Sequence, residues 1–122
     1  MDLTLYTEGF FDAAHFIKNH EGQCALLHGH TWKVSVWIRG TRDMLDSKGI
    51  LWDFGNLKKI IQFFDHHNLN EILPVNPTAE NLVIYIYEQL KKEYSYLLFK
   101  VRVYESVVSK QSYCDGGDSF VV

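Results

Sequence analysis

The first third of the chain alternates apolar and polar residues in two stretches, which are separated by a segment of loop composition. From about Leu3 to Ile17 the alternation is loose and rich in aromatic residues, and this predicts a strand. Residues 18–27 have the composition of a loop. From Thr31 to Arg39 the alternation is strict and predicts a second strand. The apolar residues on one face of this second strand are Trp32, Val34, Val36 and Ile38.

The middle of the chain changes to helical periodicity. Apolar residues recur at intervals of three and four between Phe54 and Phe64, so a helix is predicted there. Thr78 is a suitable N-cap, and Glu80 follows where the helix dipole favours an acid, so a second helix is predicted over Ala79 to Glu93. This second helix has apolar residues around much of its surface, which indicates burial against another subunit.

Alternation returns near the C-terminus. Phe99, Val101 and Val103 predict a third strand, and Glu105 continues its apolar side. A short last strand is expected from Ser119 to Val122. The order strand, strand, helix, helix, strand, strand predicts an α+β fold, in which two helices cover one face of an antiparallel sheet.

Composition agrees with one globular domain, residues 1–122. The chain is 47% hydrophobic and 22% charged, as ordinary globular proteins are, and it has neither a repeat nor a linker. Its formal net charge of −3 differs from the basic excess of proteins that coat nucleic acids. No apolar run is long enough to cross a bilayer, and the first residues lack a signal sequence. We therefore expect a cytoplasmic protein without a nucleic-acid or membrane partner.

Three histidines suggest a metal site. His28 and His30 lie two residues apart at the start of the second strand, so they share one face, and His15 lies on the apolar side of the first strand. Neutral imidazole is a good zinc ligand, and three protein ligands with an open fourth position are typical of catalytic zinc. The alternative is that His28 and His30 are surface residues and His15 is a core histidine bonded to the backbone.

A second group of residues has the chemistry of acid–base catalysis. A free thiol has a pKa of about 8.5, so Cys24 would need a neighbouring histidine or metal to act as a thiolate at neutral pH. His66 or His67 could be that neighbour, and Asp65 could orient His66. From these residues alone the plainer interpretation is favoured: an inert buried cysteine, and a solvated helix end where histidines suit the dipole.

Two more residues near the C-terminus, Glu105 and Cys114, carry reactive side chains. Glu105 could accept two N–H donors from a flat heterocycle, and the alternative is an exposed strand end. Cys114 lies in a polar, glycine-containing tail and is given no role. A disulfide between Cys24 and Cys114 is the weaker interpretation, because cytosolic thiols are kept reduced.

The chain has no glycine-rich phosphate loop and no G-x-S-x-G nucleophile turn.

Six short motifs follow one another along the chain. They are F-D-A-A-H at 11–15, C-A-L-L-H-G-H at 24–30, G-x-x-x-D-F-x-x-L-K at 49–58, D-H-H-N-L-N at 65–70, P-T-A-E-N at 77–81, and the acid Glu105. Together they resemble the 6-pyruvoyl-tetrahydropterin synthase family, which includes the 6-carboxytetrahydropterin synthases of the queuosine pathway. The short gap between Cys24 and His28 is similar to that of the carboxy branch, because the pyruvoyl branch usually has a longer insert there.

The resemblance implies a fold, an assembly and a ligand set. The fold would be the tunnelling fold, a four-stranded antiparallel sheet with two helices on one face, whose barrel closes when three subunits associate. Two such trimers would stack into a homohexamer. Zn²⁺ would be held by His15, His28 and His30, with the substrate 7,8-dihydroneopterin triphosphate at the open position. Glu105 would anchor the pterin ring beside Ser106, where the family usually has threonine.

The resemblance also implies a reaction. Cys24 as a thiolate would remove a side-chain proton, and Asp65 and His66 would relay protons, with His67 a further candidate for the relay. The carboxy branch releases acetaldehyde and triphosphate and leaves 6-carboxy-5,6,7,8-tetrahydropterin. The triphosphate partners stay open among five cations: Lys33, Arg39, Lys100, Arg102 and Lys110.

Three alternative functions stay open. One is the 6-pyruvoyl-tetrahydropterin synthase reaction, which eliminates triphosphate, and another is a related aldolase that makes a hydroxymethyl pterin. The third belongs to a different class, a non-catalytic scaffold that binds zinc or a pterin. Product identification separates the enzymes, which share nearly every motif residue.

Overall fold

Two long strands form the centre of the fold. In the computed structural model, which describes residues 1–22, 25–108 and 111–122, β1 (Asp2–His15) and β2 (His28–Thr41) run antiparallel. They pair over their whole length, from Asp2 opposite Thr41 to His15 opposite His28. Both strands were predicted from alternation, and β1 ends two residues earlier than expected.

Three shorter strands complete the sheet of the described residues. β4 (Leu98–Tyr104) pairs antiparallel with β2, and β5 (Tyr113–Gly117) pairs antiparallel with β4. On the other side, β3 (His67–Asn68) pairs parallel with β1 at Ala13 and Ala14. The strand order is β3-β1-β2-β4-β5, so the expectation of a four-stranded, purely antiparallel sheet is wrong. β3 is only two residues long, which is too short for alternation to indicate.

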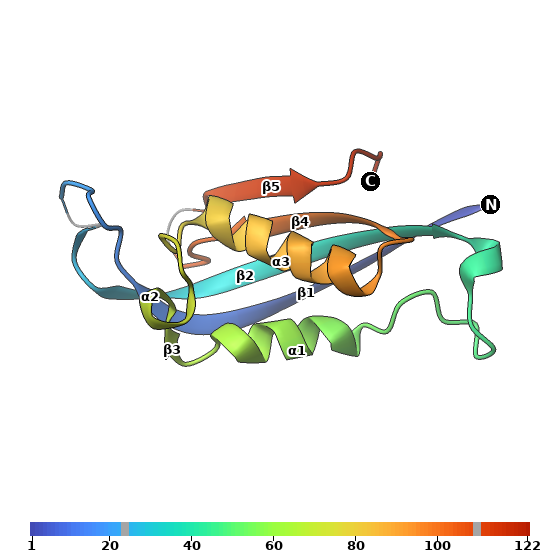
Figure 1. Cartoon of the computed structure of the whole chain (residues 1–122), viewed down its shortest axis with the longest axis horizontal. Helices are drawn as coiled ribbons and strands as arrows, with labels where there is room; N and C mark the ends of the chain where they lie inside the picture. The colour runs from blue at the N-terminus through green and yellow to red at the C-terminus, as the bar shows by residue number, and fades with distance from the viewer. Residues whose placement is uncertain (23–24, 109–110) are drawn as a thin grey trace.

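Two long helices lie on the same face of the sheet, as Figure 1 shows. They are α1 (Gly55–Phe64) and α3 (Ala79–Glu93), and both match the predicted helices closely. The Thr78 side chain accepts a hydrogen bond from the Asn81 amide at 3.1 Å, which confirms the predicted N-cap. A 3-10 turn η2 (Arg42–Met44) and a short helix α2 (Leu69–Ile72) were not predicted.

The core lies between the helices and the sheet. Apolar residues on the helix-facing side of the strands are buried, and their neighbours in sequence project from the open face, as strand geometry requires. The buried apolar strand residues are Phe11, Ala13, Trp32, Val34, Val36, Ile38, Phe99, Val101 and Val103. The α+β prediction is therefore confirmed, with the helices on one face. No helix among the described residues is long and apolar enough to span a membrane.

The last strand differs from the prediction. β5 covers Tyr113–Gly117, whereas a strand was expected at Ser119 to Val122. The glycines at 116 and 117 suggested a loop, but they allow close packing, since a Cβ at Gly116 would lie 2.7 Å from Val83 on α3. Gly117 then takes a φ of +128°, which is open to glycine, and the chain leaves the sheet there.

Asparagine side chains form hydrogen bonds with the backbone where β1 ends. The Asn70 side chain accepts from the Phe16 amide at 2.8 Å and donates to the Phe16 carbonyl at 2.9 Å. Asn76 pairs in the same way with Lys18, at 3.0 and 3.2 Å. These bonds imitate a neighbouring strand, so residues 16–18 stay tied to the fold beyond the last residue of β1.

Asp118 joins the C-terminal segment to α3. Its carboxylate accepts hydrogen bonds from the Tyr87 hydroxyl at 2.6 Å and the Phe99 amide at 3.0 Å, and lies 3.2 Å from Lys91 Nζ. The hydrogen bond to Asp118 raises the pKa of Tyr87 to about 12. Burial alone would raise the pKa of Asp118, but these donors outweigh it and lower that pKa. Asp118 therefore fixes α3 against β4.

We predict that Asp118→Ala lowers the free energy of unfolding by about 1.5–3 kcal/mol, because the three donors lose a charged acceptor. Tyr87→Phe removes one hydrogen bond and should cost only about 1 kcal/mol. Chemical denaturation at a fixed protein concentration measures both values. An Asp118→Ala protein no less stable than Tyr87→Phe would contradict this role.

Candidate metal centre and active site

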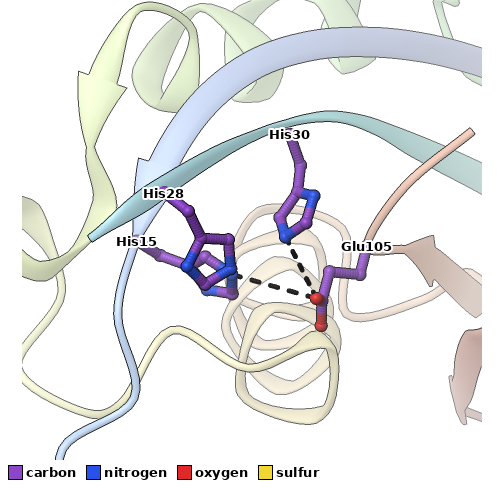
Figure 2. A group of neighbouring side chains, drawn as sticks. All are labelled: His15, His28, His30 and Glu105. Carbon is purple, nitrogen blue, oxygen red and sulfur yellow. Dashed lines mark ion pairs between the residues drawn. The ribbon is translucent and has the colours of Figure 1, made fainter. Parts of the chain in front are cut away.

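The three histidines meet where β1 ends and β2 begins. His15 is the last residue of β1 and lies directly opposite His28, while His30 is opposite Ala13. Figure 2 shows the three rings and the Glu105 side chain converging on one point. The ring centroids are 4.6 Å apart for His15 and His28, 4.7 Å for His28 and His30, and 5.2 Å for His15 and His30. The predicted triad is therefore brought together.

Backbone carbonyls orient two of the rings. His15 Nδ1 lies 2.7 Å from the Pro77 carbonyl, and His28 Nδ1 lies 2.6 Å from the Leu26 carbonyl. A carbonyl can only accept, so each Nδ1 carries the proton and each Nε2 keeps its lone pair. This pattern is typical of metal-binding histidines.

Two of the ring nitrogens are buried without a hydrogen-bond partner among the described residues. They are Nε2 of His15 and Nε2 of His30. Burial lowers the pKa of both rings, although the nearby Glu105 carboxylate acts in the opposite direction. The rings are therefore neutral near pH 7, as metal ligation requires. A buried nitrogen without a partner costs folding free energy, and a bound cation would remove that cost. These residues therefore fit a zinc ion.

Glu105 lies within reach of the same point. It follows the last residue of β4, and its Oε1 atom is 3.1 Å from His30 Nε2 and 3.9 Å from His15 Nε2. One ligand atom from each of the three histidines and Glu105 lies within 4.8 Å of all the others. The Val107 amide donates to the Thr31 carbonyl at 3.2 Å, which ties the segment after β4 to β2. The sequence suggested Glu105 as a substrate anchor. The structure shows in addition that it lies close to the histidines.

Asp65 and His66 lie together at the turn after α1. Asp65 Oδ2 is 3.5 Å from His66 Nε2, and Asp65 Oδ1 accepts from the Asp12 amide at 2.9 Å. The His66 amide donates to the Asp12 carbonyl at 2.7 Å, and His66 adopts a φ of +59°, which is uncommon for a residue other than glycine. Strained backbone of this kind is often found at functional sites. The His66 side chain is 81% exposed.

In the part of the chain that the structure describes, no hydrogen bond or ion pair joins Asp65 or His66 to the histidine cluster. His67, the further relay candidate, has its Nδ1 2.8 Å from the Asp65 carbonyl, so it also belongs to the turn. The structure thus places the three histidines at the candidate metal centre and Asp65, His66 and His67 at the turn after α1, with no described contact between the two places.

Other predicted residues are placed as follows. Cys24 and Lys110 lie outside the described residues. The Ser106 hydroxyl accepts from the Val108 amide at 3.3 Å, next to Glu105. Cys114 is free and half-buried, and burial raises the pKa of its thiol, so it is poorly suited to act as a thiolate.

Four of the five candidate triphosphate cations project from the open face of the sheet. Because side chains alternate along a strand, Lys33 on β2 points away from the face that carries His30. Lys33 lies 2.8 Å from Glu8, and Arg102 donates to Asp115 at 2.6 and 2.9 Å. The other two cations have partners there as well: Lys100 lies 3.6 Å from Asp115, and Arg39 donates to the Thr4 hydroxyl at 3.1 Å. The structure does not bring these cations to the histidines of the same chain.

Sequence reasoning missed the groups that hold the site in place. The acceptors for His15 and His28 are backbone carbonyls, which every residue has, so no residue type marks them. Pro77 and Asn70 belong to the motifs at 77–81 and 65–70. Their place in these motifs was the signal that could have marked them as supports of the site. Asp12 stands in the motif at 11–15, but it holds the Asp65–His66 turn through its backbone.

Known proteins with similar sequences support this description. The sequence model of the family described as 6-pyruvoyl tetrahydropterin synthase matches residues 4–115. A dihydroneopterin monophosphate aldolase of Pyrococcus furiosus is 41% identical over 86 residues, which cover 67% of this chain and 69% of the relative. A 6-carboxy-5,6,7,8-tetrahydropterin synthase of Synechocystis is 32% identical over 117 residues, covering 89% and 91%. The human 6-pyruvoyl tetrahydrobiopterin synthase is 37% identical over 89 residues, covering 65% and 60%.

Solved structures agree in fold. The 6-pyruvoyl tetrahydropterin synthase of Caenorhabditis elegans superposes with a TM-score of 0.74 at 26% identity, covering 98% of this chain and 97% of that one. The Plasmodium vivax enzyme gives a TM-score of 0.68 at 22% identity, covering 97% and 99%. These likenesses support the tunnelling fold for the whole chain.

We predict that the protein binds one zinc ion per chain and that His30→Ala weakens this binding by about tenfold or more, because a ligand is lost. Affinity is measured by competition with a chromophoric chelator. His20→Ala is the matched control, since His20 is an exposed histidine outside the cluster. Equal affinities for the two variants would contradict a metal centre at this position.

Acid should release the metal only below the usual pKa range of histidine. Burial lowers the pKa of His15 and His30, so protons compete with the metal at lower pH than they would at exposed rings. Zinc should stay bound at pH 7 and dissociate well below a pH of about 6.5, the ordinary pKa of histidine. An indicator dye followed across pH measures the release. Loss of zinc between pH 8 and 7 would contradict the prediction.

Proposed function

This chain belongs to the 6-pyruvoyl tetrahydropterin synthase family, and we propose that it is a zinc-dependent lyase that makes 6-carboxy-5,6,7,8-tetrahydropterin, a queuosine precursor, from 7,8-dihydroneopterin triphosphate. Acetaldehyde and triphosphate would be released. The observation that carries the proposal is the set of three converging imidazoles, with two buried and unpartnered Nε2 atoms beside Glu105. A relative named for the carboxy product spans most of the chain, and the short gap between Cys24 and His28 supports the same branch.

The metal would be held by His15, His28 and His30. When bound, zinc supplies Lewis-acid chemistry, which lowers the pKa of a substrate hydroxyl and stabilises developing negative charge. The chain's own contribution is to orient the ligands: the Pro77 and Leu26 carbonyls hold the protons on the Nδ1 atoms of His15 and His28.

Five other residues would act on the substrate. Glu105 would accept N–H groups of the pterin ring, with the Ser106 hydroxyl beside it. Cys24, as a thiolate, would remove a side-chain proton, and Asp65 with His66 would relay protons. A thiolate near neutral pH requires a nearby cation or histidine, and the bound metal or the relay histidine would supply it.

A homo-oligomer would explain the position of Asp65 and His66. The His66 side chain is exposed, and no described contact links it to the histidines of its own chain. Among the described residues, both edges of the sheet also leave strands unpaired, because β1 has no outer partner before Ala13 and β5 ends the strand order. We infer that copies of the chain associate through these edges, as a hexamer of two trimers, so that the pair from one subunit serves the metal of another.

A second candidate reaction has an observation in its favour. The aldolase of Pyrococcus furiosus is 41% identical over two thirds of this chain, a higher identity over a shorter length than the carboxy relative. An aldolase would break the pterin side chain at a carbon–carbon bond and leave a hydroxymethyl pterin. The same metal and base would serve that reaction, so the product distinguishes the two.

We predict that the zinc-loaded protein, incubated with 7,8-dihydroneopterin triphosphate, releases acetaldehyde and triphosphate in equal amounts. Mass spectrometry of the pterin should give 6-carboxy-5,6,7,8-tetrahydropterin. A 6-pyruvoyl pterin without acetaldehyde would favour the pyruvoyl reaction instead. A hydroxymethyl pterin from dihydroneopterin monophosphate would favour the aldolase, and no turnover of either substrate would favour the non-catalytic scaffold.

The two cysteines provide a matched pair of variants for this assay. Cys24→Ala should lower the turnover number by about 10²–10⁴, the usual contribution of a general base, while zinc content is retained. Cys114→Ala should turn over at the wild-type rate. If both variants behave alike, Cys24 is not the base.

A further inference from the structure

The Glu105 carboxylate lies where a fourth metal ligand would lie. In a tetrahedral zinc site with bonds of about 2.0–2.1 Å, neighbouring ligand atoms are about 3.3 Å apart. Glu105 Oε1 is 3.1 Å from His30 Nε2, close to that spacing, and 3.9 Å from His15 Nε2, somewhat longer than it. Figure 2 shows the carboxylate facing the rings.

The contact between Glu105 and His30 does not have the geometry of a hydrogen bond. His30 Nε2 has no hydrogen-bond partner of acceptable geometry among the described residues, although the carboxylate oxygen is only 3.1 Å away. Two polar atoms that lie side by side, without one aiming at the other, have the arrangement of two ligands on a common ion. A carboxylate would also partly neutralise a dication that three neutral imidazoles leave at full charge.

We propose that Glu105 is a fourth, displaceable ligand, which binds the metal in the substrate-free protein and turns to the pterin ring when substrate binds. Ligation in the free protein stands on the geometry alone, and the displacement step rests on the proposed function. Site closure by four protein atoms is otherwise typical of structural zinc. Displacement reconciles that closure with catalysis, because the fourth position opens only when substrate arrives.

Among the four ligand residues, Glu105 is the one free to leave. His15 is 1% exposed, and its ring is held by the Pro77 carbonyl, whereas the Glu105 side chain is 40% exposed. His28 and His30 are fixed within the ladder between β1 and β2. Glu105 lies just past the end of β4, so a rotation of its side chain breaks no strand pairing.

The test uses the full chain loaded with Co²⁺, whose visible absorption reports the ligands and coordination number. Without substrate, Glu105→Gln should change this spectrum and should weaken Zn²⁺ binding by about tenfold or more, as measured by chelator competition. Glu8→Gln is the matched control, because Glu8 lies on the open face beside Lys33, and it should change neither. Identical spectra and affinities for wild type and Glu105→Gln would overturn ligation.

Two further measurements guard against a misfolded variant and test displacement. For Glu105→Ala, added acetate should move the Co²⁺ spectrum back toward wild type, because the free carboxylate enters the vacated position. Neopterin added to the wild-type Co²⁺ protein should move its spectrum toward that of Glu105→Gln. A wild-type spectrum unchanged by saturating neopterin would make Glu105 a permanent ligand and overturn displacement. Turnover of dihydroneopterin triphosphate is measured separately, so failure of the proposed function is recognised independently.

Discussion

The candidate site depends on the register between β1 and β2. His15 lies opposite His28 because fourteen residues of each strand pair without a bulge. Side chains alternate along a strand, so a slip of one residue would send His28 and His30 to the open face while His15 stayed inside. The buried face from Trp32 to Ile38 opposes such a slip, since it would expose the apolar core. The hydrophobic core and the candidate metal centre are thus specified by the same pairing.

Loops from three parts of the chain complete what the strands begin. The Pro77 carbonyl comes from the segment before α3, the Leu26 carbonyl from the loop before β2, and Glu105 from the end of β4. Each contact acts on a ring already placed by the ladder. The strands therefore set where the histidines lie. The loops set which nitrogen of His15 and His28 keeps its lone pair, and they bring Glu105 beside His30.

Residue patterns predicted those features that repeat along the chain. The two long strands, the two long helices and the shared face of His28 and His30 follow from periods of two and 3.6 residues. β3 is too short to show a period, and the glycines of β5 resemble a loop. The position of Glu105 beside His30 depends on the pairing of β4 with β2, which no local pattern contains. The separation of the Asp65–His66 turn from the histidines is likewise a property of three-dimensional packing, and the role of Cys24 stays a prediction.

The amide clamps after β1 bear on how this fold tolerates change. Asn70 and Asn76 hold Phe16 and Lys18 by both backbone groups, and this attachment comes before the loop that leads to β2. A change in loop length beyond Lys18 is therefore separated from His15 by two fixed points. An insertion or deletion in that loop would therefore leave His15, the first of the three histidines, in place. Two uncharged side chains in this way insulate the end of β1 from the length of the loop that follows it.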